Sequence, residues 1–274
     1  MSNTITIAVS TAPDMQAVLD TISETLHIND LRIVGDMEDV WPEGVQQLYR
    51  DKVSTRYTEV SYDGSEFAVR IFTNAWHEDV ELALAFVEVL AAHGETEVVD
   101  AEGFGELRVD ELAANYDRAW TEAQFGSGIG AIAHLIKDGR GPIQMPGPNR
   151  PVYVDRALLD DMAKSHDDAV RIIREIRWNP RRTAGEFVAR DPAGTEKTLA
   201  LWIGDDCIFP SVEWLAISPT RDGKNPFLIP AIRLRELAGD KWHRLDASQA
   251  ILDAITDDGE WAAIVAHARG FLPN

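Results

Sequence analysis

The sequence predicts an α+β fold, with a mixed, mainly antiparallel sheet or sheets and packed helices. Alternating strand patterns occur beside helical ones, and the clearest strand pair is joined by a tight turn. No sustained strand–helix–strand alternation runs along the chain. The 274 residues are 45% hydrophobic, with eight Trp and nine Phe, which is enough for a buried core. This length suits one large domain or two α+β subdomains.

The first elements are two strands with a helix between them. Residues 4–9 alternate with period two, and residues 31–34 form a second, short strand pattern. A helix is expected over about 13–26, because Thr11 and Asp14 fit a capping box. The N-terminal part of the chain therefore contributes both element types to one core.

A hairpin and a long helix follow. Segments 54–62 and 65–73 flank an Asp-Gly dipeptide at 63–64, which is a strong signal for a tight turn. Residues 76–93 predict a helix, with Asn74 as its cap. Apolar residues at helical spacing form its predicted buried face: Val80, Ala83, Leu84, Val87, Leu90 and Ala91.

After this helix the sequence predicts one short strand and two helices. The strand lies near 96–99. A helix over 110–124 is expected to end at Gly126, because glycine commonly terminates helices. A shorter helix is then expected over 129–136.

Residues 139–151 are the predicted domain boundary. This segment, GRGPIQMPGPNRP, contains three Gly and four Pro. The division gives an N-terminal α+β domain over 1–138 and a C-terminal α+β domain over 152–274. The alternative is an ordered crossing segment inside one domain.

The C-terminal part again mixes helices and strands. A long helix is predicted over 156–178, and Asp246 with Gln249 forms a capping box that opens a helix over about 247–256. Residues 226–232 contain two prolines, which restricts them to an edge strand. The remaining predictions are strands near 185–190, 198–203 and 207–217 and a helix over 258–269 that ends at Gly270.

Charge is the feature that points to a function. Residues 78–117, the acidic segment, contain twelve acidic residues and one basic residue, Arg108. Their net charge is −11, more than half of the −20 of the whole chain. An acidic surface attracts basic partners. The composition offers an alternative, because 20 Arg against 6 Lys is also typical of GC-rich coding or a salt-adapted proteome.

The bulk properties exclude several function classes. A pI near 4.6 disfavours nucleic acid and anionic membranes as ligands. No apolar run approaches the roughly 18 residues that cross a bilayer, and the N-terminus lacks the basic start of a signal peptide. Cys207 is the single cysteine, so no internal disulfide or multi-cysteine metal site is expected. These observations favour the cytoplasm.

Two sequence patterns resemble ligand sites without meeting their requirements. Residues 126–131, GSGIGA, match the glycine pattern of dinucleotide-binding turns, but a predicted helix and no strand precedes them. Residues 100–111 follow some EF-hand spacing, yet Phe104 and Arg108 occupy ligand positions. We predict no cofactor and no metal site.

Titratable residues gather around His166, but their spacing indicates no chemistry. Neither His nor Glu lies one helical turn from His166, as a zinc or acid–base site would need. We expect a partly buried histidine on the apolar side of the helix, and we assign no catalytic residue.

The one basic patch is the arginine cluster, which consists of Arg171, Arg174, Arg177, Arg181 and Arg182. Its expected use is pairing with the acidic segment or stabilising a helix end; the alternative is an anion or partner site. If the cluster neutralises the acidic segment, that segment is structural.

The predicted function is that of an acidic cytoplasmic protein that engages a basic protein partner. This character is typical of bacterial immunity proteins and antitoxins, which cap toxins; the likeness is one of composition. The predicted partner-binding residues are Glu78, Glu81, Glu88, Glu95, Glu97, Asp100 and Glu102. The alternatives are an enzyme whose acid and histidine site is assembled from scattered residues, and a DNA mimic. The clustering of the acids disfavours the mimic. The sequence leaves the oligomeric state open.

Overall fold

The protein folds into two compact α+β units, residues 1–178 and 179–274. The structure is a computed structural model and describes residues 2–34, 41, 45–190 and 194–272. The α+β class agrees with the sequence prediction. Residues 139–151, the predicted boundary, lie inside the first unit, and the division falls between Trp178 and Asn179.

The first unit is built on a seven-stranded antiparallel sheet in the order β2-β3-β4-β5-β1-β6-β7. The strands are β1 (Ser2–Ala8), β2 (Leu31–Ile33), β3 (Val45–Arg50), β4 (Thr58–Tyr62), β5 (Glu66–Phe72), β6 (Val98–Ala101) and β7 (Gly105–Arg108). The predicted hairpin is confirmed, because β4 and β5 pair across the turn at 63–65. Strand β7 forms one edge of the sheet.

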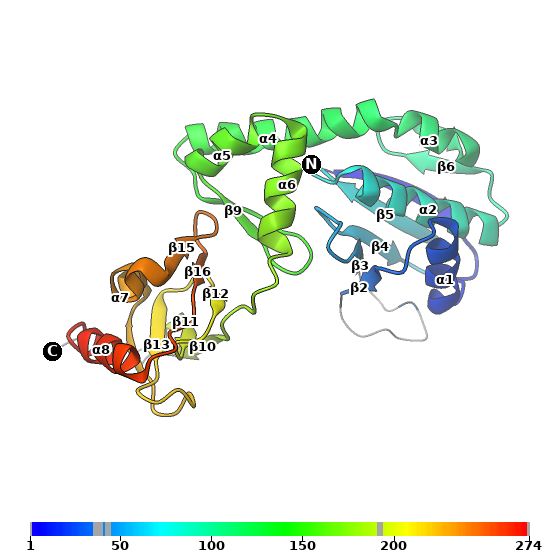
Figure 1. Ribbon diagram of the computed structural model, residues 1–274. Helices are drawn as coiled ribbons and strands as arrows, with labels where there is room; N and C mark the ends of the chain where they lie inside the picture. Colours follow the sequence, from blue (N-terminus) through cyan, green and yellow to red (C-terminus); the bar gives the residue numbers. More distant parts are fainter. Residues whose placement is uncertain (1, 35–40, 42–44, 191–193, 273–274) are drawn as a thin grey trace. The chain divides into compact units, whose positions relative to one another are not determined.

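Two helices cover one face of this sheet. α1 (Met15–Thr25) and α2 (His77–His93) lie side by side against it (Figure 1). All six predicted core residues of α2 are buried, together with inward-facing residues of β1, β5 and β6 such as Ile5, Val69 and Val99. The opposite face of the sheet carries the intervening residues, because side chains alternate along a strand.

Both helices begin differently from the prediction. Asp14 itself caps α1, by accepting a hydrogen bond from the Ala17 amide, so Thr11 is not the cap. α2 begins after Trp76, whose amide donates to the Asp79 carboxylate. Asn74 lies two residues earlier in a left-handed conformation, with φ 72°, and does not cap the helix.

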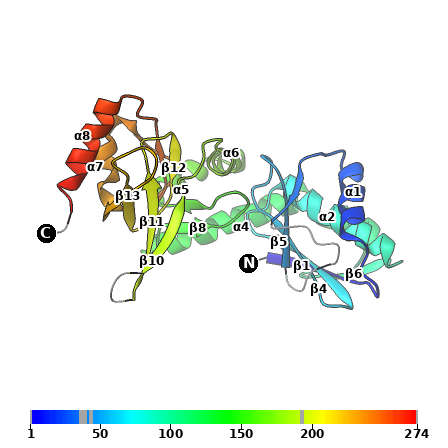
Figure 2. The same cartoon turned by 90° about the horizontal axis from the view of Figure 1, so that it is seen from below.

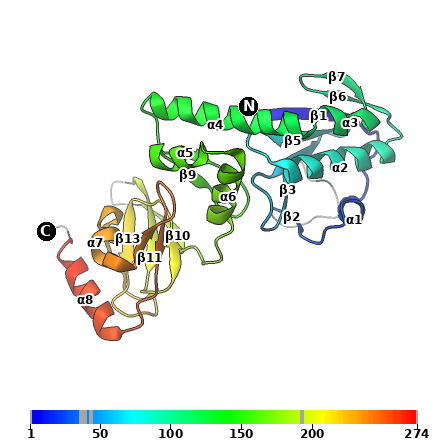
Figure 3. The same cartoon turned by 45° about the horizontal axis from the view of Figure 1, so that its top comes forward.

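The predicted helix break at Gly126 is wrong. α4 (Arg118–Lys137) runs without interruption through the three glycines of the GSGIGA stretch, after a short α3 (Leu112–Asn115) and a 3-10 turn at Val109–Glu111 (Figure 3). Close packing explains two of these glycines. A Cβ on Gly126 would lie 3.1 Å from Nε2 of His166, and one on Gly128 would lie 2.4 Å from Nδ2 of Asn74.

Glycine substitutions in α4 test this packing. Gly128→Ala is expected to destabilise the protein by about 1–3 kcal/mol, because Asn74 must move and lose its hydrogen bond to the Phe125 carbonyl. Gly130→Ala is the matched control, since its Cβ would meet nothing within 4 Å. The free energy of unfolding of that variant should rise by about 1 kcal/mol, because alanine has a higher helix propensity than glycine. Urea unfolding measures both, and equal effects would contradict the packing role.

The rest of the first unit packs against α4. β8 (Ile143–Met145) pairs with β9 (Val152–Val154). The predicted helix over 156–178 is two helices, α5 (Arg156–Met162) and α6 (His166–Arg177). Ser165 interrupts it, because its hydroxyl caps α6 by accepting from the Asp168 amide.

Arg177, predicted to belong to a surface patch, is fully buried. Its Nη1 donates to the carbonyl of Arg150 at 2.7 Å, and its Nη2 donates to the carbonyls of Met145 at 3.2 Å and Pro146 at 3.0 Å. A Cβ on Gly147 would lie 2.3 Å from the guanidinium carbon. The guanidinium therefore fixes the 145–150 segment, and burial lowers its pKa to about 9.

Asp79 is another buried ionisable residue of this unit. Its Oδ2 accepts four hydrogen bonds, from the Thr55 amide and hydroxyl and from the amides of Arg56 and Trp76, at 2.7–3.1 Å. Burial raises the pKa of this carboxyl group. One side chain thus joins the start of α2 to the loop before β4.

The second unit contains a four-stranded sheet in the order β10-β11-β13-β14 and a three-stranded sheet in the order β12-β16-β15. These strands are β10 (Glu186–Arg190), β11 (Glu196–Trp202), β12 (Cys207–Phe209), β13 (Trp214–Ile217), β14 (Phe227–Pro230), β15 (Trp242–Arg244) and β16 (Ala250–Leu252). β14 is an edge strand, as predicted. Cys207 is buried in β12.

Two α-helices of the second unit, α7 (Leu234–Ala238) and α8 (Asp258–Arg269), lie on one side of its strands (Figure 2). 3-10 turns occur at Ala231–Arg233 and Gly239–Lys241. The predicted helix over 247–256 is wrong. Asp246 accepts from the amides of Ser248 and Gln249, but these bonds close a turn between β15 and β16. No helix of the described ranges is long and apolar enough to cross a membrane.

Candidate functional site

The seven predicted partner-binding residues do not lie on one surface. Glu78 is half-buried at the start of α2, and its carboxylate pairs with Nη2 of Arg174 at 2.8 Å. This ion pair joins α2 to α6 inside the first unit. Glu78 is therefore a structural residue in this protein.

Two of the predicted residues occupy the outer side of α2. Glu81 and Glu88 are exposed and lie two turns apart on the helix. Partial burial beside α1 raises the pKa of Glu88. Glu95 follows the helix in a left-handed conformation and is also exposed.

The remaining predicted residues belong to the β6–β7 hairpin and its flanks. Asp100 is exposed and points away from α2, because its neighbours Val99 and Ala101 are buried in the core beneath that helix. Glu102 follows β6, and its carboxylate accepts a hydrogen bond from the Thr4 amide at 3.0 Å. Glu97 precedes β6, and 83% of its side chain is exposed.

Asp100 lies directly opposite Glu106 in the hairpin register, and both are exposed. Like charges opposite each other on antiparallel strands are destabilising. Arg108 offsets them incompletely, because its guanidinium pairs with Asp110 at 3.0 Å and lies 3.7 Å from Glu97. We call Glu97, Asp100, Glu102 and Glu106 the hairpin acids.

Apolar side chains are exposed beside the hairpin acids. Val98 in β6 is 45% exposed, and Phe104 at the hairpin turn is 39% exposed. The Phe104 ring contacts Tyr116 edge-on, which fixes its position at the turn. Because β7 is an edge strand of the sheet (Figure 3), the hairpin combines negative charge, exposed apolar groups and a strand edge that pairs with no other described strand.

The arginine cluster does not neutralise these acids. Among the described ion pairs, only Arg174 reaches the acidic segment, through Glu78. Arg171 pairs along its own helix with Asp168 and Glu175. In the second unit, Arg181 pairs with Asp206 and Asp253, and Arg182 with Asp205.

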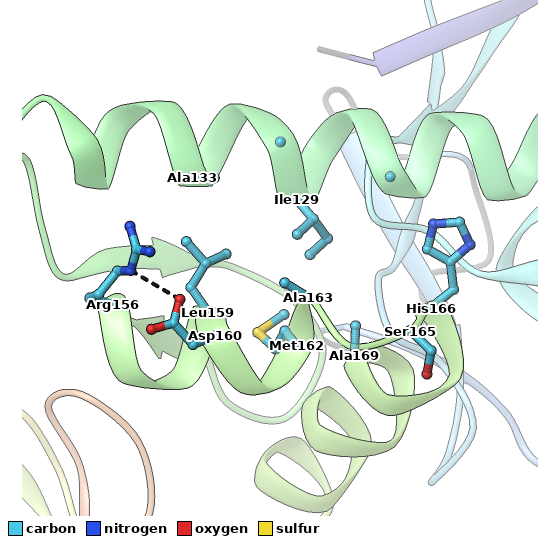
Figure 4. A pocket seen from close by; sticks show the side chains of 12 residues that line it. Ile129, Ala133, Arg156, Leu159, Asp160, Met162, Ala163, Ser165, His166 and Ala169 are labelled. Carbon is cyan, nitrogen blue, oxygen red and sulfur yellow. Dashed lines mark ion pairs between the residues drawn. The ribbon is translucent and has the colours of Figure 1, made fainter.

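A cavity of about 660 Å³ lies between α4, α5 and α6 (Figure 4). Its sides are formed by small and apolar residues that include Ile129, Leu159 and Met162. His166 lies at one end, while Asp160 lies at the other and pairs with Arg156 at 2.9 Å. The cavity thus keeps the imidazole and this carboxylate apart, which does not suit an acid–base pair.

The His166 ring packs edge-on against Trp76 and Phe125. The residue is exposed and begins α6, which differs from the partly buried mid-helix position that was predicted. Residues 100–111, which follow EF-hand spacing in part, form the β6–β7 hairpin and the turn after it. Within the described ranges, no group of three or more His, Cys, Asp or Glu side chains is arranged to hold a metal ion.

The acids are evident in the sequence, but the face of the sheet on which each one lies was not predicted. The alternation of residues 98–101 is the sequence signal that these acids lie on different faces of the sheet, because apolar Val99 and Ala101 lie on either side of Asp100. The sequence predicts only a strand near 96–99, so Glu106 was not predicted as the partner of Asp100 across the hairpin.

Residues 6–172 match a protein family described as a domain of unknown function, DUF4299. The matched stretch covers more than half of the chain and lies within the first unit, which carries the hairpin acids. No curated protein and no solved structure matches the chain.

Proposed function

The chain belongs to the DUF4299 family, and we propose that it binds a basic protein partner through the outer face of its β6–β7 hairpin. The observation that carries the proposal is the exposed Asp100–Glu106 pair, two carboxylates directly opposite each other without a cation between them in the register. Such a pair lowers the stability of the free protein. An Arg or Lys from a partner would remove that repulsion on binding.

Electrostatics and exposed apolar groups support the same surface. Four carboxylates on and beside the hairpin steer a basic partner and speed its encounter. Val98 and Phe104 supply apolar contact area, and aromatic residues are enriched at protein interfaces. The interface would therefore gain affinity from both charge pairing and apolar burial.

The proposal narrows the predicted surface to one face. Of the predicted residues, Asp100 belongs to this face, and Glu106 joins it across the hairpin; Glu97 and Glu102 flank β6 at its two ends. Glu81 and Glu88 lie on the other side of the sheet, over α2. In the setting we propose, the partner is a toxin and the protein neutralises it in the bacterial cytoplasm, as immunity proteins and antitoxins do.

Capture from a native cell lysate at low and high salt tests the proposal. Wild type should retain a specific basic protein, with less retained at high salt because charge pairing is screened. Asp100→Asn/Glu106→Gln should lose it. Glu81→Gln/Glu88→Gln is the matched control, since it removes two charges of the same segment from the opposite side of the sheet. Equal retention by both variants, or none by wild type, would refute the proposal.

Repulsion between two of the hairpin acids should also lower the free energy of unfolding of the protein. Asp100→Asn should raise the free energy of unfolding by about 0.5 kcal/mol, because it ends the repulsion across the strands. Glu106→Gln should do the same alone and add little in the double variant. A double-mutant cycle from urea unfolding measures this coupling. Additive or destabilising effects would show that the two carboxylates do not repel each other.

A further inference from the structure

A second cavity in the first unit is lined by cationic side chains, although the chain is strongly acidic. It has a volume of about 310 Å³ and lies between the end of β5, the second half of α4 and the β8 segment. Arg56 and Arg70 line it, together with the amide side chains of Asn74 and Gln144. Apolar residues of α4 and β8, such as Ile132 and Ile143, form its other side.

Arg56 is buried here without a carboxylate partner. The residue is only 7% exposed, and within the described part of the chain its guanidinium makes no ion pair. Nη1 donates to the carbonyl of Pro146, while the buried Nε has no hydrogen-bond partner among the described residues. Buried cations in proteins are normally paired, because an isolated charge loses its hydration on burial.

The nearest carboxylates are already committed. Asp79 uses Oδ2 to accept four hydrogen bonds, one of them from the Arg56 backbone amide. Glu59 pairs with Nη1 of Arg70 at 3.2 Å, and Nε of Arg70 donates to the Ser2 hydroxyl at 2.8 Å. Among the described residues, Nη2 is the Arg70 nitrogen that these bonds leave for a ligand. Burial lowers the pKa of Arg56, although the charges of Asp79 and Glu59 act in the opposite direction.

The Phe72 ring, which also lines the cavity, lies close to both arginines. The guanidinium carbons of Arg56 and Arg70 each lie 4.6 Å from the centre of the Phe72 ring. The left-handed conformation of Asn74 is uncommon for a non-glycine residue, and its amide is fixed by donating to the Phe125 carbonyl at 3.3 Å. The cavity therefore presents hydrogen-bond donors that the surrounding structure holds in place.

We propose that this cavity binds a phosphate group, either as inorganic phosphate or as the phosphate of a small monoester, between Arg56 and Arg70. Guanidinium groups present paired donors that match phosphate oxygens. The apolar side formed by α4 and β8 accommodates the carbon part of a monoester. This site is separate from the hairpin acids and does not depend on the partner proposed above.

Thermal unfolding tests the proposal. The unfolding midpoint is measured with inorganic phosphate or phenyl phosphate and compared with the midpoint in sodium chloride at equal ionic strength. Ligand binding to the folded state should raise the unfolding midpoint with phosphate concentration beyond the effect of chloride. Arg70→Gln should abolish this extra shift and still fold, because its side chain is 46% exposed. Arg32→Gln, an exposed arginine of β2 that does not line the cavity, is the matched control.

A second measurement reports on Arg56 without mutating it. In ¹H–¹⁵N spectra of the full chain, phosphate should shift the Arg56 Nε–H resonance in wild type and in Arg32→Gln, but not in Arg70→Gln. A larger response to phenyl phosphate than to inorganic phosphate identifies a monoester as the ligand, and an equal response identifies the free ion. A midpoint shift no greater than that with chloride, or the same shift in both variants, overturns the proposal.

Discussion

Replacing Arg177 with methionine is expected to destabilise the protein by about 3–5 kcal/mol. Methionine keeps much of the side-chain volume but donates no hydrogen bond. The carbonyls of Met145 and Arg150 would lose their bonds from the buried guanidinium, while the Pro146 carbonyl would keep its bond from Nη1 of Arg56. A buried carbonyl without a donor costs about 1–3 kcal/mol. Urea unfolding of wild type and variant measures the loss.

Arg177→Lys separates charge from geometry in this experiment. Lysine keeps the positive charge but cannot reach three carbonyls with a planar fork, so most of the loss should remain. Arg171→Met is the control on the same helix, since Arg171 is exposed and its ion pairs among the described residues are with Asp168 and Glu175. Its effect should stay below about 1 kcal/mol. An equally small effect of Arg177→Met would show that the guanidinium does not fix the 145–150 segment.

Asp79→Ala is expected to be the second severe substitution, with a loss of about 3–5 kcal/mol. Four donors converge on Oδ2 of this carboxylate, and three of them are backbone amides that no rotamer change can redirect. The helix start and the loop before β4 would lose their common anchor. The free energy of unfolding, measured in urea, reports this loss.

Asp79→Asn is the informative companion to this variant. Asparagine keeps an acceptor oxygen of the same size, so it should retain part of the network and lose clearly less stability than alanine. If Asn and Ala destabilise equally, the negative charge matters more than the acceptor geometry. If neither changes the free energy of unfolding, the carboxylate does not hold α2 to the preceding loop.

The fold class and many of the elements could be predicted because their signals are local. The Asp-Gly turn between β4 and β5 and the core face of α2 depend on residues adjacent in sequence or one turn apart. The failures required tertiary information. Gly126 and Gly128 resemble a helix stop, but the helix continues because the side chains of His166 and Asn74 pack against these two glycines.

The candidate site was predicted in part for the same reason. Counting charges identifies the acidic segment and the arginine cluster, but it does not show that Asp79 and Arg177 are buried. Both lie on apolar helical stripes, which is the signal that was available: Leu82 and Phe86 follow Asp79, and Val170 and Ile173 precede Arg177 at helical spacing. The cavity with Arg56 and Arg70 lies between β5, α4 and β8, which are far apart in the sequence, so no residue spacing predicts it.

We propose that the outer face of the β6–β7 hairpin holds a basic partner. Its most direct test is a titration of the captured partner, once purified, against wild type, Asp100→Asn/Glu106→Gln and Glu81→Gln/Glu88→Gln. At least about tenfold weaker binding is expected for the hairpin variant alone, equivalent to about 1.4 kcal/mol. Unchanged affinity of the hairpin variant, or an equal loss in both variants, would contradict it.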